Sequence, residues 1–171
     1  MDQLVETLDQ AIKKTTIKTG KYLTFTLNEE EYGIGILKVK EIIGMMPITS
    51  VPRTKEFVKG VVNLRGKVIP VMDLRIKFDM VAIPYTERTC IIVVEIDTES
   101  QTVLMGIVVD AVSEVVNISE EQIEDTPAFG SKMNTEYILG MAKTGGGVKI
   151  LLNIDQVLSI EEISAGETAA Q

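Results

Sequence analysis

Hydrophobic and polar residues alternate over many short segments of this chain, which is the pattern of half-buried β-strands. In KYLTFTL (21–27), two leucines and a phenylalanine alternate with a tyrosine and two threonines. Polar segments such as NEEE and DTESQ separate these stretches and predict turns. The same reading predicts further strands over 32–43, 60–74, 89–96, 102–116 and 148–154. The chain is therefore predicted to be mainly β.

Helical spacing is found mainly at the two ends of the chain. An apolar stripe at helical spacing predicts an N-terminal helix or a flexible segment over 1–18, carried by Leu4, Val5, Leu8 and Ile12. One short helical turn is expected at Glu120 to Ile123, and another helix near Asp155. The acidic, small-residue end, 161–171, is expected to be a flexible tail.

The sequence repeats itself. GIGILKVKEII, from Gly33, aligns with GIVVDAVSEVV, from Gly106, and FVKGVVNLRGKVIPVMDL, from Phe57, aligns with YILGMAKTGGGVKILLNI, from Tyr137. We interpret this as two β units, the first over about 21–80 and the second over about 87–155, with strand exchange between them left open. Units this small barely sustain a core alone. The two are expected to share an interface with a groove between them.

Arg65 is the main candidate for a binding residue. It lies in the NLRG connection between two predicted strands, and the second unit has glycine at this place, in TGGG around Gly145. The turn can therefore be built without arginine, which favours a role for Arg65 in a site. The alternative is a solvated loop arginine.

The amino-acid composition limits the kinds of catalytic site, metal site and partner that are expected. The 171 residues include no histidine and one cysteine, Cys90, so His-based triads are impossible and no metal site or cofactor is predicted. The net charge of −8 disfavours nucleic acid and anionic membranes as partners. Apolar runs of about five residues are far shorter than the ~20 of a membrane span, and no secretory signal is visible at the N-terminus. These features predict a cytoplasmic binding module, not an enzyme, and Met45 and Met46 offer it an adaptable contact surface.

Four segments together resemble the CheW-type chemotaxis coupling proteins: EYGIGILKVKEII, FVKGVVNLRGKVIPVMDLR, GIVVDAVSEVV, and EYILGMAK followed by VKILLNI. The resemblance implies a single CheW-like domain over 19–160, made of two pseudo-symmetric five-stranded SH3-like β-barrels with a shared hydrophobic core and short terminal helices. It also implies a non-catalytic adaptor. Such a protein couples the cytoplasmic tips of methyl-accepting chemoreceptors to the regulatory domain of the CheA histidine kinase, in arrays at the membrane.

The resemblance also suggests contact residues. Val39, Glu41 and Arg65 match family positions implicated in receptor contacts, and Val112 is the repeat mate of Val39. In a regular strand Val39, Glu41 and Ile43 would share one face, so Ile43 joins the predicted receptor site. We further expect Glu41 and Arg65 to meet at its rim. The kinase contact is assigned to Leu139 and Met141.

Two alternatives remain open from the sequence. One is a coupling module of a non-swimming chemosensory system. The other is a small-ligand binder that uses the groove between the barrels.

Overall fold

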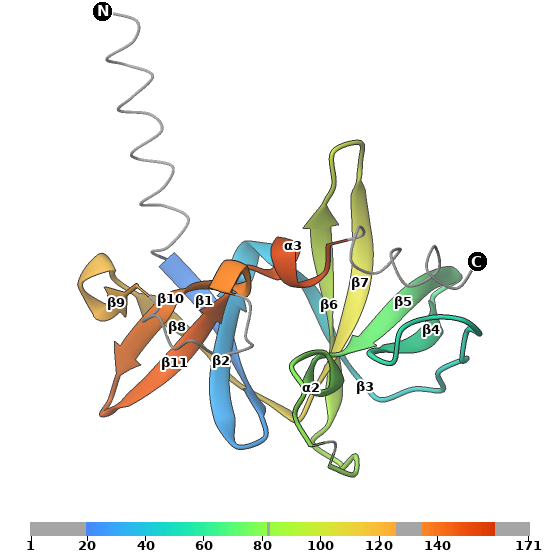
Figure 1. The fold of residues 1–171 in the computed structure, drawn as a ribbon, viewed down its shortest axis with the longest axis horizontal. Coiled ribbons are helices and arrows are strands. Elements are labelled where there is room, and N and C mark those ends of the chain that lie inside the picture. The colour runs from blue at the N-terminus through green and yellow to red at the C-terminus, as the bar shows by residue number, and fades with distance from the viewer. Residues whose placement is uncertain (1–19, 82, 126–134, 160–171) are drawn as a thin grey trace, which may run out of the picture.

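A computed structural model describes residues 20–81, 83–125 and 135–159 (Figure 1). Within these residues, eleven strands form two sheets that lie side by side, with short helices between them. The prediction of a mainly β fold is confirmed. The predicted N-terminal helix at 1–18 and the predicted tail at 161–171 lie outside the described residues.

One sheet has the strand order β8-β1-β2-β11-β10-β9. Its strands are β1 (Gly20–Leu27), β2 (Glu30–Gly35), β8 (Ala111–Ile118), β9 (Ile123–Glu124), β10 (Ile138–Thr144) and β11 (Gly147–Leu152). The other has the order β3-β6-β7-β5-β4. Its strands are β3 (Val39–Gly44), β4 (Val58–Leu64), β5 (Lys67–Asp73), β6 (Cys90–Asp97) and β7 (Thr102–Val109). We call them the first and second sheet. The expected five strands are found in the second, and the two-residue β9 is a sixth in the first.

Five short helices complete the described fold. Two are α-helices, α2 (Leu74–Lys77) and α3 (Ile154–Val157), and each begins directly after or close to the last strand of its unit. Three are 3-10 helices, at Ile36–Lys38, Glu120–Gln122 and Thr135–Tyr137. The helix expected near Asp155 and the helical turn expected at Glu120 are both confirmed.

The two units exchange strands. The β1–β2 hairpin of the first unit lies in the first sheet beside β8, β10 and β11 of the second unit, and the β6–β7 hairpin makes the reciprocal exchange. Parallel pairing of β2 with β11 and of β5 with β7 joins the strands of different units. The chain therefore passes between the sheets twice, from β2 to β3 and from β7 to β8. We call these two connections the crossovers.

Two strands predicted as continuous are broken at the crossovers. The predicted strand over 32–43 is interrupted by the 3-10 helix at Ile36–Lys38, and the one over 102–116 changes sheet at Asp110. Apolar residues occur on both sides of each break because both flanking strands bury a face. A period-two pattern does not reveal that its strand has moved to another sheet.

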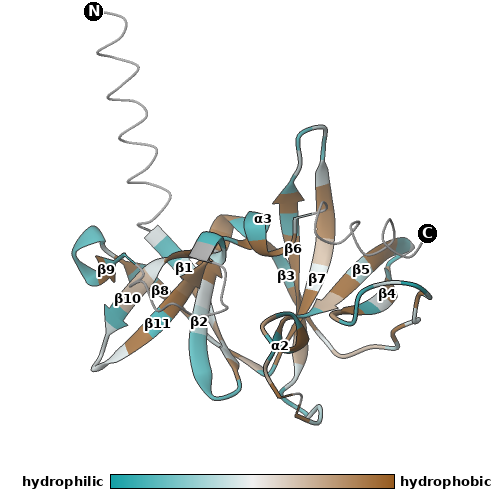
Figure 2. Cartoon of the chain, viewed as in Figure 1, coloured by the Kyte–Doolittle hydropathy of each residue, from teal (hydrophilic) through white to brown (hydrophobic). Residues whose placement is uncertain are grey.

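The largest hydrophobic cluster lies between the sheets and draws on both, with Phe25 and Ile34 from the first and Ile92 and Ile107 from the second. We call it the central cluster; it confirms the expected shared core. Each sheet also encloses a smaller cluster of its own. Strands such as β1 and β6 are consequently buried on both faces, whereas hairpin tips are hydrophilic (Figure 2).

Candidate protein-interaction site

The β4–β5 hairpin turn presents Arg65. Arg65 and Gly66 have φ angles of +50° and +87°, and the equivalent Gly145 and Gly146 of the β10–β11 turn have +51° and +88°. Two positive φ angles define a type I′ turn, which strongly prefers glycine and asparagine. A non-glycine residue in this region costs about 1–2 kcal/mol. The first unit therefore carries an arginine where the same backbone is easier to form with glycine.

Arg65 forms an ion pair with Glu41 of β3, its Nη2 donating to Oε1 of the carboxylate. This hydrogen bond raises the pKa of Arg65 above its ordinary value. The Arg65 side chain is 71% exposed and that of Glu41 is 30% exposed. Because β3 and β4 are the two ends of the second sheet, the pair joins its edges. The structure thus brings together the two charged residues expected to meet.

Val39 and Ile43 do not share a face with each other. Val39 contacts the central cluster, whereas Ile43 contacts the cluster enclosed by the second sheet. The pairing of β3 with β6 shifts register between Val39 and Glu41. A bulge of this kind inserts one extra residue and moves the following side chains to the other face. The prediction that Val39, Glu41 and Ile43 line one face is therefore wrong, because alternation in the sequence does not show the bulge.

Val112 occupies the position equivalent to Val39. It lies near the start of β8, it contacts the central cluster, and its strand also shifts register, between the partners of Leu23 and Phe25. The two valines are thus repeat mates in structure as well as in sequence. Each stands just after a crossover, at the border of the core that both sheets share.

The predicted kinase residues lie on β10. Leu139 is half-buried against the cluster of the first sheet. Met141 is also half-buried, with Ile150 of β11 opposite it on one side and Glu124 of β9 on the other. The short β9 therefore covers the edge of β10 at this point.

Two apolar features near these residues were not assigned to the site from the sequence. Leu37 is 91% exposed in the middle of the 3-10 helix that precedes Val39. The sequence analysis predicted one continuous strand over 32–43 and so did not expect an exposed Leu37. Gly35, just before the 3-10 helix, was the residue that hinted at an interruption. The second feature is an open depression of about 530 Å³, lined by Met45, Met46, Pro47, Ile48, Ser50, Lys59 and Tyr85. It includes the methionine pair singled out in the sequence.

The described part of the chain offers little for bond-making chemistry. No group of three or more His, Cys, Asp or Glu residues within it could hold a metal ion. Burial raises the pKa of the Cys90 thiol, which packs beside the central cluster and is therefore poorly reactive. Nor does any helix among these residues have the length and apolar character needed to cross a membrane.

Comparison with known proteins agrees with this geometry. The family model of the CheW-like domain matches residues 21–162. The chemotaxis protein CheW of Klebsiella aerogenes is 42% identical over 151 residues, which cover 88% of this chain and 89% of the relative. The chemotaxis protein CheW of Thermotoga maritima is 32% identical, with 95% and 99% covered.

A solved structure gives the same answer. The crystal structure of the scaffolding protein TtCheW from Thermoanaerobacter tengcongensis superimposes with a TM-score of 0.73 at 37% sequence identity, covering 83% of this chain and 94% of that one. The fold, the repeat and the sequence matches thus lead to one assignment: this chain belongs to the family of CheW-like chemotaxis proteins.

Proposed function

We propose that this protein is a non-catalytic adaptor that couples the cytoplasmic tips of chemoreceptors to a CheA-type histidine kinase. Its relatives are named as chemotaxis proteins, and the related crystal structure is described as that of a scaffolding protein. In this role the protein works in the cytoplasm and is recruited to receptor arrays at the membrane. It binds the regulatory domain of the kinase and the receptor, and uses no cofactor.

The observation that carries the proposal is the conformation of Arg65. Its left-handed backbone opposes folding, while the glycine pair of the second unit shows that the turn does not need an arginine. Its exposed guanidinium is held by Glu41 but has five N–H donors in a planar fork. Preorganised groups of this kind lose little entropy on binding. An unfavourable but oriented arginine on the surface is therefore best explained by a partner.

Val39 and Val112 supply the apolar part of the proposed receptor site, with the exposed Leu37 beside Val39. A helical receptor tip presents apolar residues at intervals of three and four positions and needs apolar contacts of this type. Glu41 and Arg65 supply the polar part, from the end of the second sheet. Ile43 belongs to the site only as support, because it packs inside that sheet.

The proposed kinase contact stays on β10, at Leu139 and Met141. Both side chains are half-buried, so each keeps apolar surface that a partner domain can cover. In this proposal the kinase binds the first sheet, which contains β10, and the receptor binds near Arg65 on the second, so one molecule can hold both partners.

A three-component binding experiment tests the proposal. The kinase regulatory domain and a receptor cytoplasmic fragment are sedimented together, with and without this protein. We expect a complex that contains all three only when the protein is present, and micromolar binding to the kinase domain by calorimetry, about −8 kcal/mol. Failure to bind the kinase domain at high concentration would contradict the proposal and favour a coupling module for other partners. Small-molecule binding between the sheets would favour the ligand-binder alternative.

A further inference from the structure

The two crossovers are held by ion pairs of opposite polarity. Lys38 ends the 3-10 helix of the β2–β3 crossover and pairs with Asp155 of α3. Asp110 forms the β7–β8 crossover and pairs with Arg75 of α2. Arg75 and Asp155 are repeat mates in the aligned sequences. The same junction of crossover and helix thus has a cationic helix in one unit and an anionic helix in the other.

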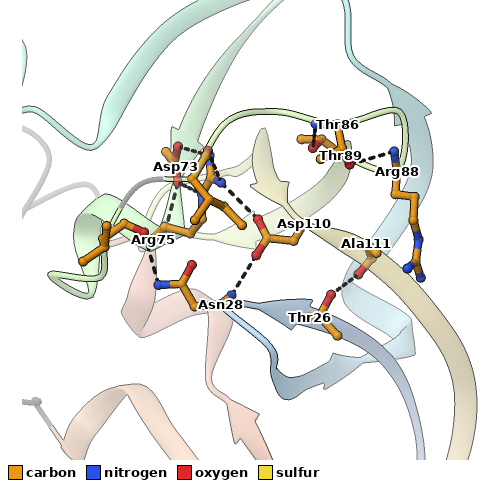
Figure 3. A network of polar contacts seen from close by, with 11 residues as sticks. Thr26, Asn28, Asp73, Arg75, Thr86, Arg88, Thr89, Asp110 and Ala111 are labelled. Carbon is orange, nitrogen blue, oxygen red and sulfur yellow. Dashed lines mark hydrogen bonds and ion pairs between the residues drawn. The ribbon is translucent and has the colours of Figure 1, made fainter.

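The ion pair at Asp110 is buried (Figure 3). Arg75 Nη1 lies 3.1 Å from Asp110 Oδ1, and Nη2 lies 3.1 Å from Asp73 Oδ2. The guanidinium also donates to the carbonyl oxygen of Ile83 at 2.9 Å. Asp110 Oδ2 in turn accepts from the backbone N–H of Asn28, in the β1–β2 turn, at 2.7 Å. We call Arg75, Asp73 and Asp110 the buried crossover contact; the side chains of Arg75 and Asp73 are each 1% exposed and that of Asp110 is 15% exposed.

The ion pair at Lys38 is partly exposed. Lys38 Nζ lies 2.8 Å from Asp155 Oδ2 and 3.0 Å from Asp97 Oδ2, and the backbone N–H of Asp97 donates to Asp155 Oδ1 at 3.0 Å. The side chains of Lys38, Asp155 and Asp97 are 27%, 30% and 67% exposed. We call these three residues the exposed crossover contact. It also joins the sheets, since α3 follows β11 of the first sheet and Asp97 ends β6 of the second.

Each contact includes a residue that lies one or two positions before one of the paired valines. Lys38 precedes Val39, whose backbone N–H donates to Ile36 O within the same 3-10 helix. Asp110 lies two residues before Val112, and its backbone N–H donates to Thr26 O of β1 at 3.0 Å. Each valine therefore lies within two residues of a side chain that an ion pair holds at its crossover.

We propose that Lys38 and Asp110 are positioning residues for the receptor site: Asp110 fixes Val112 through a buried contact, and Lys38 holds Val39 through a contact that solvent and salt can weaken. This inference rests on the proposed function for its receptor. Salt screens exposed charges far more than buried ones. The Val39 side of the site is accordingly adjustable, and the Val112 side is fixed.

The test compares Lys38→Met with Lys40→Met. Lys40 is a matched control because its ion pair with Glu95 lies within the second sheet and does not join the sheets. Methyl NMR reports changes in the surroundings of Val39 and Val112 without a partner. Calorimetry with a purified receptor cytoplasmic fragment reports affinity at low and high salt.

We expect Lys38→Met to shift the Val39 methyl resonances, leave those of Val112 in place, and weaken receptor binding by about fivefold, the upper limit for a partly exposed pair. Lys40→Met should shift the Val39 resonances less and leave receptor affinity unchanged, and high salt should bring the wild type close to Lys38→Met. Unmoved Val39 resonances, or equal effects of the two variants, would overturn the inference. Absence of receptor binding by the wild type would instead refute the proposed function, while the NMR result would still decide the inference.

Discussion

The two units of this protein share a backbone plan but differ in the side chains at equivalent places. The β4–β5 and β10–β11 turns have nearly the same pair of positive φ angles, yet one begins with Arg65 and the other with Gly145. The repeat therefore separates residues that the fold needs from residues it merely tolerates. Arg65 belongs to the second group, and this is why we assign it to binding.

The crossovers also differ, because the ion pair at one is buried and the ion pair at the other is partly exposed. The buried crossover contact satisfies Arg75 with two carboxylates and a carbonyl oxygen, whereas the exposed crossover contact leaves Lys38 partly in water. A buried charge that loses its partner has no solvent to replace it. We therefore expect the junction to contribute much more to stability in one unit than in the other.

The largest predicted difference between the two contacts appears when the cation of each is removed in a separate variant. Arg75→Met leaves Asp73 and Asp110 without their cation and is expected to cost about 3–5 kcal/mol of unfolding free energy. Lys38→Met is expected to cost about 0–1 kcal/mol, because its carboxylates are hydrated. Urea unfolding of both variants measures the difference. Equal losses would show that burial does not distinguish the two contacts.

The next largest effect on stability is predicted at two equivalent glycines, Gly60 and Gly140, where another segment passes close to the backbone. Gly60 has φ +142°, and a Cβ there would lie 2.0 Å from the carbonyl oxygen of Thr49. At Gly140 a Cβ would lie 2.7 Å from a side-chain methyl of Ile123, which can move, and 3.1 Å from the carbonyl oxygen of Glu124. Gly60→Ala is therefore expected to cost at least about 1–3 kcal/mol and more than Gly140→Ala. Thermal unfolding of the pair checks the order, and the reverse order would contradict the structure.

Exchanging the turn residues tests whether either hairpin needs arginine or glycine for stability. Gly145→Arg is expected to lose about 1–2 kcal/mol, because it places a side chain on a left-handed backbone. Arg65→Gly should leave stability unchanged or raise it slightly, since relief of the backbone offsets the exposed ion pair with Glu41. Chemical unfolding provides the measurement. Substantial destabilisation by Arg65→Gly would mean that the arginine serves folding after all.

The smallest predicted effect concerns the acid side of the exposed crossover contact. The hydrogen bond from Lys38 lowers the pKa of Asp97 below its ordinary value of 3.8. Asp97 therefore contributes stability above that pH, and the contribution is lost as the pH falls through the lowered pKa. Carboxyl NMR titration should show the low pKa in the wild type and its return towards 3.8 in Lys38→Met. An unchanged pKa in the variant would exclude the pairing in solution.

Much of this architecture was accessible from the sequence, and the failures have a common cause. Alternation located the strands, and the repeat predicted a shared core, because both depend on burial, which leaves a period in the sequence. The break at Asp110 and the bulge after Val39 were missed, since a change of sheet or face preserves apolar content. The Arg65–Glu41 contact was expected only as a hypothesis. The Arg75 network was not found at all, because buried ion pairs have no periodic signature.

Calorimetric titration of Arg65→Gly with the receptor cytoplasmic fragment and with the kinase regulatory domain, alongside its unfolding curve, decides whether Arg65 serves receptor binding. We expect native stability, unchanged kinase affinity, and receptor binding weakened by roughly tenfold, as when a charged hydrogen bond is lost from an interface. Receptor and kinase affinities that both match the wild type would contradict this expectation and leave Arg65 as a solvated residue of the turn.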